Sequence, residues 1–380
     1  MKNKIRFLFV VLALQAGVHS TLAQLTLGIA PAGGQSIIYW PTSSTNYTLQ
    51  TTTNLATPNW VTASNALTVN AVVVTNSEPS GYFRLLAETN TTAGMVLIPA
   101  GSFLMGNYLF YNTATNDPDI PDAKPTNVYV SAFFVDANLV SYGQWQAIYD
   151  WATNNGYGFT NAGSGRGNNY PAVTVNWFDC VKWCNARSQQ AGLTPAYYTD
   201  AGFTQVFTNG DNGMTVYLNL TNDGYRLPTE AEWEKAARGG LVGQRFPWGN
   251  SISENQANYE AEPGAYSFDL GPYTGYNTNF YANLFNSTSP VGSFAPNGYG
   301  LYDMAGNVQE WCWDWYGVPY GQPTTNNPTG PAGPSEISPG RLLRGGYWYS
   351  TANFARCNMR VFNLPQYANP ETGLRCVRGL

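Results

Sequence analysis

Histidine is almost missing from this chain. The 380 residues contain one histidine, His19, which lies near the N-terminus. Serine or cysteine nucleophiles with a histidine base, histidine zinc sites and non-haem iron sites all need this side chain in the folded protein. If the first 23 residues are removed, as expected below, none of these chemistries is available to the mature protein.

Charged side chains are also scarce. Asp, Glu, Lys and Arg make up 11% of the chain, and its formal net charge is −5. Removing residues 1–23 deletes three basic groups and no acidic group, which takes this charge to −8. Because the surface is acidic and has no basic cluster, nucleic acids and anionic membranes are not expected as partners.

No apolar run is long enough to span a membrane, which requires about 20 residues. The run 7–14 follows three basic residues and precedes small residues that end at Ala23. This order is typical of a secretory signal peptide over residues 1–23, with cleavage after Ala23. No cysteine stands near this point, which excludes lipid attachment there. We therefore expect a secreted, periplasmic or cell-surface protein.

Cysteines are few and odd in number. Cys180, Cys184, Cys312, Cys357 and Cys376 all lie in the second half of the chain. Export permits disulfides, but with five cysteines at least one is free or paired with another chain. Cys180 and Cys184 lie four residues apart on an expected helix, so their side chains are nearly parallel and should not bond to each other.

Residues 24–90 carry the pattern of a small β-sandwich-like module. Short β-rich runs at 37–40, 47–52, 59–62, 71–75 and 82–86 alternate with Pro, Ser, Asn and Thr. A polar joint at 89–94 leads into a large domain, residues 91–380.

The large domain shows two legible helices. One is expected to begin near Asn176 and to place Trp177, Val181 and Cys184 on one stripe. The other begins at Thr229, where a Thr-x-x-Glu capping box precedes an apolar face. Asn-Gly pairs at 209–210 and 212–213 predict tight turns between the two helices.

Five collinear segments of this domain resemble the formylglycine-generating enzyme family, also called sulfatase-modifying factors. They are MVLIPAGSFLMG (95–106), VNWFDC with WC (175–184), YRLPTEAEWE with RGG (225–240), PVGSF with NGYGLYDMAGNVQEW (290–311), and RLLRGG (341–346) with the closing GLR (373–375). The resemblance implies an α+β, irregular, C-type-lectin-like fold with few regular elements, preceded by the small all-β module. Arg226 and Glu232 are interpreted as a structural ion pair and cap, and the tryptophans mostly as core.

The resemblance also implies calcium. Family members bind Ca²⁺ through a loop that matches Asp303, Gly306, Val308 and Glu310, which would supply carboxylate and carbonyl oxygens. A second family site begins at the position of Asn258 and Tyr259, for which Asp269 is the candidate acidic partner. The alternative is that these residues only cap loops.

The resemblance implies two disulfides, of which this sequence contains both cysteines of one and a single cysteine of the other. One maps onto Cys184 and Cys376, which are both present and would close a very long loop. The other would join the positions of Ala237 and Cys357, and its first cysteine is absent.

The family's enzymes oxidise a substrate cysteine with two cysteines, five residues apart, that hold copper(I) after the Arg-Gly-Gly motif. Counting forward from Gly346, these positions are Ser350 and Ala355; counting back from Cys357, they are Tyr347 and Ala352. Neither register contains a thiolate for copper(I), so copper is not expected. The related iron-dependent sulfoxide synthases need three histidines, and the mature chain is expected to contain none.

The same loop is the binding face of lectin-fold proteins in retroelement-diversified systems. Here it offers Tyr347, Trp348, Tyr349 and Asn353, which combine apolar contact with hydrogen bonding. These side chains form either a ligand-binding face or part of the core.

The sequence thus favours a secreted, non-catalytic ligand-binding or structural module whose ligand is a protein or a glycan. One alternative is a formylglycine-generating oxidase with an unrecognised site. Another is a different enzyme on the same scaffold.

Overall fold

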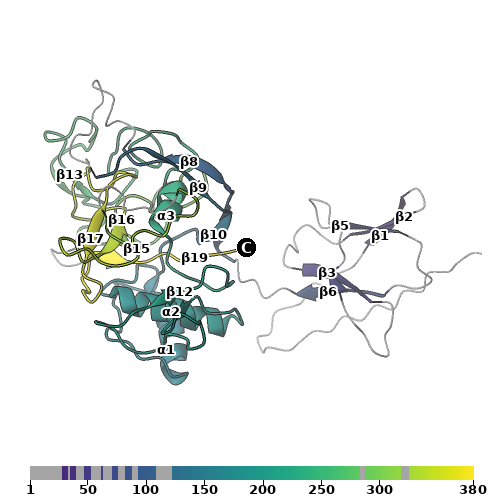
Figure 1. Cartoon of the computed structure of the whole chain (residues 1–380). Helices are drawn as coiled ribbons and strands as arrows, with labels where there is room; N and C mark the ends of the chain where they lie inside the picture. Colours follow the sequence, from purple (N-terminus) through teal and green to yellow (C-terminus); the bar gives the residue numbers. More distant parts are fainter. Residues whose placement is uncertain are drawn as a thin grey trace, which may run out of the picture. The chain divides into compact units, whose positions relative to one another are not determined.

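The structure is a computed structural model (Figure 1) that describes residues 93–107, 122–282, 287–317 and 325–380, and the backbone of six strands between residues 28 and 87. The chain divides into two compact units, Met1–Ala93 and Gly94–Leu380. The expected signal peptide lies outside the described residues. None of the helices in the described residues is long and apolar enough to cross a membrane.

The first unit contains two antiparallel three-stranded sheets, ordered β1-β2-β5 and β4-β3-β6. Their strands are β1 (Gly28–Ala32), β2 (Gln35–Tyr39), β3 (Tyr47–Thr52), β4 (Val61–Thr62), β5 (Ala71–Thr75) and β6 (Tyr82–Ala87). Five of them coincide with the predicted runs to within about two residues at each end. The sequence reading missed β1, whose Gly and Pro are weak strand formers. It is an edge strand, where proline is tolerated.

The second unit is α+β and is built from three helices and many short strands within its described residues, as expected. Its elements are β7 (Met95–Ile98), β8 (Gly101–Met105), β9 (Thr126–Val130), β10 (Phe133–Asp136), α1 (Tyr142–Asn154), α2 (Trp177–Gln190), β11 (Tyr197–Tyr198), β12 (Tyr217–Leu218), α3 (Glu230–Ala237), β13 (Glu260–Ala261), β14 (Gly275–Tyr276), β15 (Gln309–Trp315), β16 (Arg341–Arg344), β17 (Val361–Asn363), β18 (Thr372–Gly373) and β19 (Val377–Arg378).

The C-terminal segment joins two sheets of this unit. β19 pairs with β10 in the sheet β19-β10-β7, and β18 pairs in parallel with β15 in the sheet β17-β16-β15-β18. The pairs β8-β9, β11-β12 and β13-β14 form separate small sheets. Residues close to the chain end therefore bind to β10, near the beginning of the domain, and to β15, in its last third.

Helices α1 and α2 lie side by side at one end of the unit (Figure 1). Trp145 of α1 stacks on Trp183 of α2 with a centroid distance of 5.6 Å, and the Trp183 indole donates to the Trp145 carbonyl. The predicted start of α2 is confirmed, because the Asn176 side chain caps the helix by accepting the Asp179 N–H. The sequence reading missed α1, although Ser141 and Gln144 form a capping box there.

Helix α3 is buried on every side, and its acidic side chains are matched by arginines. The predicted capping box of Thr229 and Glu232 is present. Glu232 also holds Arg226 through two hydrogen bonds of 2.6 and 2.7 Å. The structural interpretation of the Arg226–Glu232 pair is therefore confirmed.

Asp314 of β15 is a buried carboxyl group beside the start of α3. Its Oδ2 accepts the Glu230 N–H at 2.9 Å, and its Oδ1 has no hydrogen-bond partner. Burial, reinforced by the negative charge of Glu230, raises the pKa of Asp314 to about 8. The native protein thus keeps a proton that the unfolded chain releases near pH 4.

We predict that this proton makes stability fall as the pH rises from about 4 to about 8, because the native state binds it over that range. Asp314→Asn removes the titration, so the free energy of unfolding of this variant should change less with pH, by on the order of a few kcal/mol over the same range. Urea unfolding at a series of pH values measures this. The exposed Asp150→Asn variant is the control and should keep the parental profile. A profile of Asp314→Asn that matches the parent would contradict the prediction.

Candidate functional site

The loop that follows β16 is held in place by two glycines. Gly345 and Gly346 have φ angles of 98° and 70°, which side chains rarely adopt. A Cβ on Gly345 would lie 3.1 Å from the Trp233 ring, and one on Gly346 would lie 3.0 Å from the backbone of Phe354. The positive φ angles of these two glycines turn the chain sharply into the loop 347–356, where their neighbours leave no room for a side chain.

The positions that match the family's cysteine pair lie inside this loop. Ser350, Ala352 and Ala355 are all buried. The Ser350 hydroxyl donates to the carbonyl of Tyr347 at 2.9 Å and accepts the N–H of Tyr347 at 2.8 Å. Ser350 therefore stabilises the turn of the loop, and the two alanines pack in a small core cluster.

All five cysteines are buried in the interior. The sulfur atoms of Cys184 and Cys376 are 3.5 Å apart, so the structure brings together the pair expected to form a disulfide. Cys312 and Cys357 belong to a different core cluster, and burial raises the pKa of Cys357 to about 12. The reactive form of cysteine is the thiolate, so Cys357 is not poised as a nucleophile.

A connected series of rings extends from the loop after β16 to the segment around β14. Tyr347 contacts Tyr349, Tyr349 contacts Trp348, and Trp348 contacts Tyr276, with centroid distances of 4.7, 4.6 and 5.9 Å. Tyr276 stacks on Tyr281 at 5.2 Å. We call these five residues the aromatic face.

Backbone hydrogen bonds fix the two halves of the aromatic face. The Glu260 N–H of β13 donates to the Ser350 carbonyl at 3.0 Å, and β13 pairs with β14 so that Glu260 lies opposite Tyr276. Tyr276 and Tyr281 are thereby carried to the loop that bears Tyr347 and Tyr349. The segment from β13 to Tyr281 therefore supplies two of the five rings.

The predicted binding residues do not all reach the surface. Tyr347, Tyr349 and Asn353 are half-buried, whereas Trp348 is 1% exposed and its indole N–H has no hydrogen-bond partner. Of the two alternatives left open by the sequence, a binding face or part of the core, Trp348 takes the second. Trp348 packs against Tyr276 and Tyr349, because the apolar indole is better buried than solvated.

Carboxylates lie beside these rings. The Tyr349 hydroxyl donates to Glu371 Oε1 at 2.6 Å, and Glu371 Oε2 has no hydrogen-bond partner. Burial and the negative charges of Glu371 and Glu260 raise the pKa of Tyr347. Burial and the neighbouring Glu262 raise the pKa of Glu260 in the same way. The site therefore combines aromatic rings with negative charge.

Asp303 fits a role as a calcium ligand. It is buried, its φ angle is 55°, and its Oδ2 accepts the Gly292 N–H at 2.7 Å. Its Oδ1 has no hydrogen-bond partner, and burial raises the pKa of this carboxyl group to about 6. An enclosed carboxylate oxygen without a donor is the kind of atom that a hard cation would satisfy.

Glu310 is already matched by protein groups. Arg375 donates to both of its oxygens, and its Nε lies 3.1 Å from Oε2, which also accepts the Trp233 indole N–H at 3.0 Å. Gly306 lies close to Asn258, whose carbonyl oxygen would be 2.4 Å from an added Cβ. The expected set of Asp303, Gly306, Val308 and Glu310 thus fits a cation at Asp303, while Arg375 neutralises Glu310.

The second expected calcium set has a different arrangement. Asp269 accepts the Tyr259 hydroxyl at 2.6 Å, the Glu262 N–H at 2.6 Å and the Gly271 N–H at 2.9 Å. The Asn258 side chain donates to the Ser287 carbonyl at 2.8 Å. Both oxygens of Asp269 already accept protein donors, which favours a role in holding the loop.

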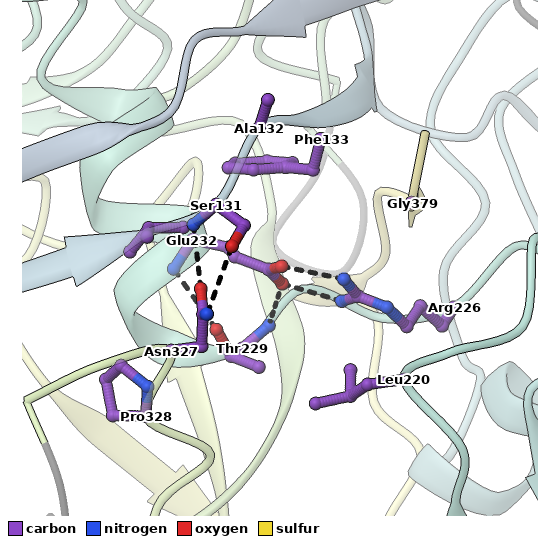
Figure 2. A pocket seen from close by; sticks show the side chains of 11 residues that line it. Ser131, Ala132, Phe133, Leu220, Arg226, Thr229, Glu232, Asn327, Pro328 and Gly379 are labelled. Atoms are coloured by element: carbon purple, nitrogen blue, oxygen red, sulfur yellow. Dashed lines mark hydrogen bonds and ion pairs between the residues drawn. The ribbon is translucent and has the colours of Figure 1, made fainter.

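A separate pocket of about 160 Å³ lies beside the start of α3 (Figure 2). The Arg226–Glu232 pair forms part of its wall, and Asn327 accepts the Ser131 N–H at 2.7 Å and donates to the Ser131 hydroxyl at 3.0 Å (Figure 2). The charged groups in this wall are paired with each other. The pocket therefore lacks the free convergent polar groups that mark a binding site.

Comparison with known proteins identifies the family. Residues 83–380 match the model of the sulfatase-modifying factor enzyme 1-like domain. The chain belongs to this family. The formylglycine-generating enzyme of Bos taurus is 30% identical over 305 residues, which cover 74% of each chain.

Other relatives of this sulfatase-modifying factor domain carry different names. Chaperone protein LppX of Paenibacillus barcinonensis is 34% identical over 258 residues, which cover 66% of this chain and 82% of LppX. Treponema denticola variable protein 1 has a similar structure, with a TM-score of 0.56 and 28% identity over 75% of this chain and 95% of that chain. The predicted fold is therefore confirmed.

Sequence reasoning missed part of the candidate site. Glu371, Glu260, Tyr276 and Tyr281 lie far from the loop after β16 in sequence, and no local motif marks them. The closing Gly-Leu-Arg motif, two residues after Glu371, was the nearest signal. Strand pairing brings these residues to the loop.

We predict that Cys184 and Cys376 form a disulfide in the exported protein. Chain entropy sets an upper limit of about 5 kcal/mol for the stabilisation, because the 192-residue separation makes the closed loop very long. Peptide mapping without reduction should recover the two cysteines linked, and reduction should lower the melting temperature. Cys180, one turn earlier in α2, should be recovered separately from them. Recovery of Cys376 as a free thiol from alkylated protein would refute the bridge.

Proposed function

We propose that this chain is an exported, non-catalytic member of the formylglycine-generating enzyme family whose aromatic face binds a ligand. The observation that carries the proposal is which residues the loop after β16 holds. At the positions of the family's cysteine pair, this loop holds a serine that stabilises its own turn and alanines that pack in the core. Copper(I) needs soft ligands, which these residues do not provide.

The position of the cysteines supports the same proposal. Cys357 is the cysteine nearest to the loop, and its carbonyl and N–H bond to Arg344 and Arg245 in the interior. Its thiol is buried and has a raised pKa. Capture of a substrate cysteine requires an accessible thiolate.

Names within the family do not decide between the two functions. One relative is named as a formylglycine-generating enzyme, another as a chaperone and a third as a variable protein. The fold is thus shared by proteins with different names, so the function has to be argued from the site. The oxidase remains the second candidate, favoured by the 30% identity to the Bos taurus enzyme.

We also propose that Ca²⁺ binds at Asp303 and stabilises the loop on which the aromatic face packs. The loop that follows Asp303 contacts the face directly, because the Asn307 carbonyl accepts the Trp348 N–H at 3.0 Å. The Gly306 N–H donates to the Gly345 carbonyl at 2.7 Å in the same region. A cation that satisfies the free oxygen of Asp303 would stabilise both contacts.

Calcium should raise the melting temperature of the purified protein, and a chelator should lower it. Asp303→Asn should lose this dependence on calcium, because it removes the free carboxylate oxygen. Glu310→Gln is the informative comparison: it should lower stability by about 3 to 5 kcal/mol with or without calcium, because it breaks the buried pair with Arg375. If a chelator leaves the melting temperature of the parent unchanged, calcium binding at Asp303 is wrong.

The protein should not convert the cysteine of a sulfatase-type Cys-x-Pro-x-Arg peptide into formylglycine. The physical reason is the missing pair of soft ligands, whose loss removes the metal itself. Mass spectrometry of the peptide after incubation with copper-loaded protein and oxygen measures the conversion, with an active formylglycine-generating enzyme as the positive control. Conversion that disappears in Cys357→Ser would make Cys357 a catalytic residue and would overturn the proposal.

A further inference from the structure

The region that builds one half of the aromatic face has no basic residue. Between Arg245 and Arg341 the sequence contains no Lys, Arg or His, whereas it contains eight Asp and Glu residues. Glu260 and Glu262 lie in this region. Glu371 lies outside it but stands beside the same face, because it accepts the Tyr349 hydroxyl. The negative charge near the face therefore has no counterpart along this long stretch of chain.

Other buried glutamates of the protein are neutralised by arginine. In α3, Glu234 pairs with Arg238 at 2.7 Å and also with Arg344, and Glu230 pairs with Arg360 at 2.6 Å. Carboxylates that leave water normally have such a partner, because an unpaired buried charge is costly.

The glutamates beside the aromatic face have no such partner. Within the described part of the chain, no ion pair joins Glu260, Glu262 or Glu371 to a Lys or Arg, although all three are half-buried. Glu371 is held only through one oxygen, by a tyrosine hydroxyl. These carboxylates thus lack the compensating cation that the glutamates of α3 have.

Arg356 and Arg166 follow or contact residues of the face, and within the described part of the chain their hydrogen bonds go to other groups. Arg356 is buried, donates to the Asn353 carbonyl at 2.8 Å and lies over the Phe268 ring. Arg166 donates to the carbonyl oxygens of Phe280 and Thr288, at 2.8 and 2.6 Å. Neither arginine is paired with Glu260, Glu262 or Glu371 in the described part of the chain, which leaves the position beside these glutamates to a cation from outside.

The aromatic rings suit the same ligand. Tyr281 is 45% exposed and Tyr276, Tyr347 and Tyr349 are half-buried, so rings border the glutamates at the surface. A guanidinium or ammonium group is attracted both to ring faces and to carboxylates.

We propose that the aromatic face, with Glu260, Glu262 and Glu371, binds the cationic side chain of an arginine or lysine in a partner protein. This inference rests on the proposed non-catalytic function and narrows its ligand from a protein or a glycan to a basic peptide segment. The exposed and half-buried tyrosine rings supply contact area, and the glutamates supply the charge. A neutral glycan would leave the charge of the glutamates uncompensated.

The experiment uses a capped tri-arginine peptide and its tri-citrulline counterpart, titrated into the full mature chain by calorimetry. Citrulline keeps the shape and the hydrogen-bond donors of arginine on its urea group but has no charge. The arginine peptide should bind saturably, and the citrulline peptide should bind at least about tenfold more weakly, since hydrogen bonds to a charged group contribute about 1.5 to 3 kcal/mol. Added salt should weaken binding of the arginine peptide.

Variants locate the site. The double variant Glu260→Gln/Glu371→Gln should bind the arginine peptide at least about tenfold more weakly, and Tyr281→Ala several-fold more weakly. Glu336→Gln is the matched control, because it removes one exposed negative charge that has no contact with the aromatic face among the described residues, and it should bind like the parent. Melting temperatures identify any variant that fails to fold. If the double variant fails to fold, Tyr281→Ala still tests the face, because Tyr281 is exposed.

Three results would overturn the inference. They are equal binding of the arginine and citrulline peptides, parental affinity in the double variant and Tyr281→Ala, or no saturable binding of tri-arginine at low salt. Saturable binding of a neutral glycan that Tyr281→Ala abolishes, with no binding of tri-arginine, would assign the face to glycans. Each of these leaves the non-catalytic proposal standing, whereas formation of formylglycine overturns that proposal whatever the peptide does.

Discussion

The buried ion pairs of α3 are the interaction on which the arrangement of this domain depends. Arg344, at the end of β16, bonds to Glu234 and to the carbonyl oxygens of Met359 and Cys357, and the side chains of Arg344 and Glu234 have no contact with solvent. The same Glu234 accepts the Gly106 N–H, which ties β8 to the helix. Because a buried carboxylate without its arginine is so unfavourable, these bonds fix α3, β8 and β16 relative to one another. The loop after β16 therefore begins from a rigid point.

That rigid point determines what the loop does. Gly345 and Gly346 turn the chain where a side chain would collide with Trp233 or Phe354, and Ser350 closes the turn on itself. A loop built in this way presents tyrosines and hides its alanines. The same scaffold that carries a redox pair in the family's enzymes here carries rings and, through β13 and Glu371, carboxylates. The fold determines where the loop after β16 lies, and the residues of the loop decide its chemistry.

Sequence reasoning succeeded where the signal is local. The caps at Asn176 and Thr229, the strands of the first unit and the Arg226–Glu232 pair depend on residues within a few positions of each other, so their patterns are visible in the chain. The helix α1 had the same kind of signal, a Ser-x-x-Gln box, and was overlooked. The sequence left open whether Trp348 lies on the surface or in the core, because alternation along a short loop does not reveal which ring faces the interior.

By itself the sequence determined the family, the near absence of histidine and the absence of cysteine from the loop after β16, since these depend only on which residues are present and in what order. Only the tertiary structure decided which side chains meet. Glu371 and Tyr281 join the loop through strand pairing and ring stacking between segments far apart in the chain. Charge compensation follows the same rule: an arginine neutralises a glutamate only where the folded backbone brings them together, as in α3. In the described part of the chain, no arginine is paired with Glu260, Glu262 or Glu371 at the aromatic face.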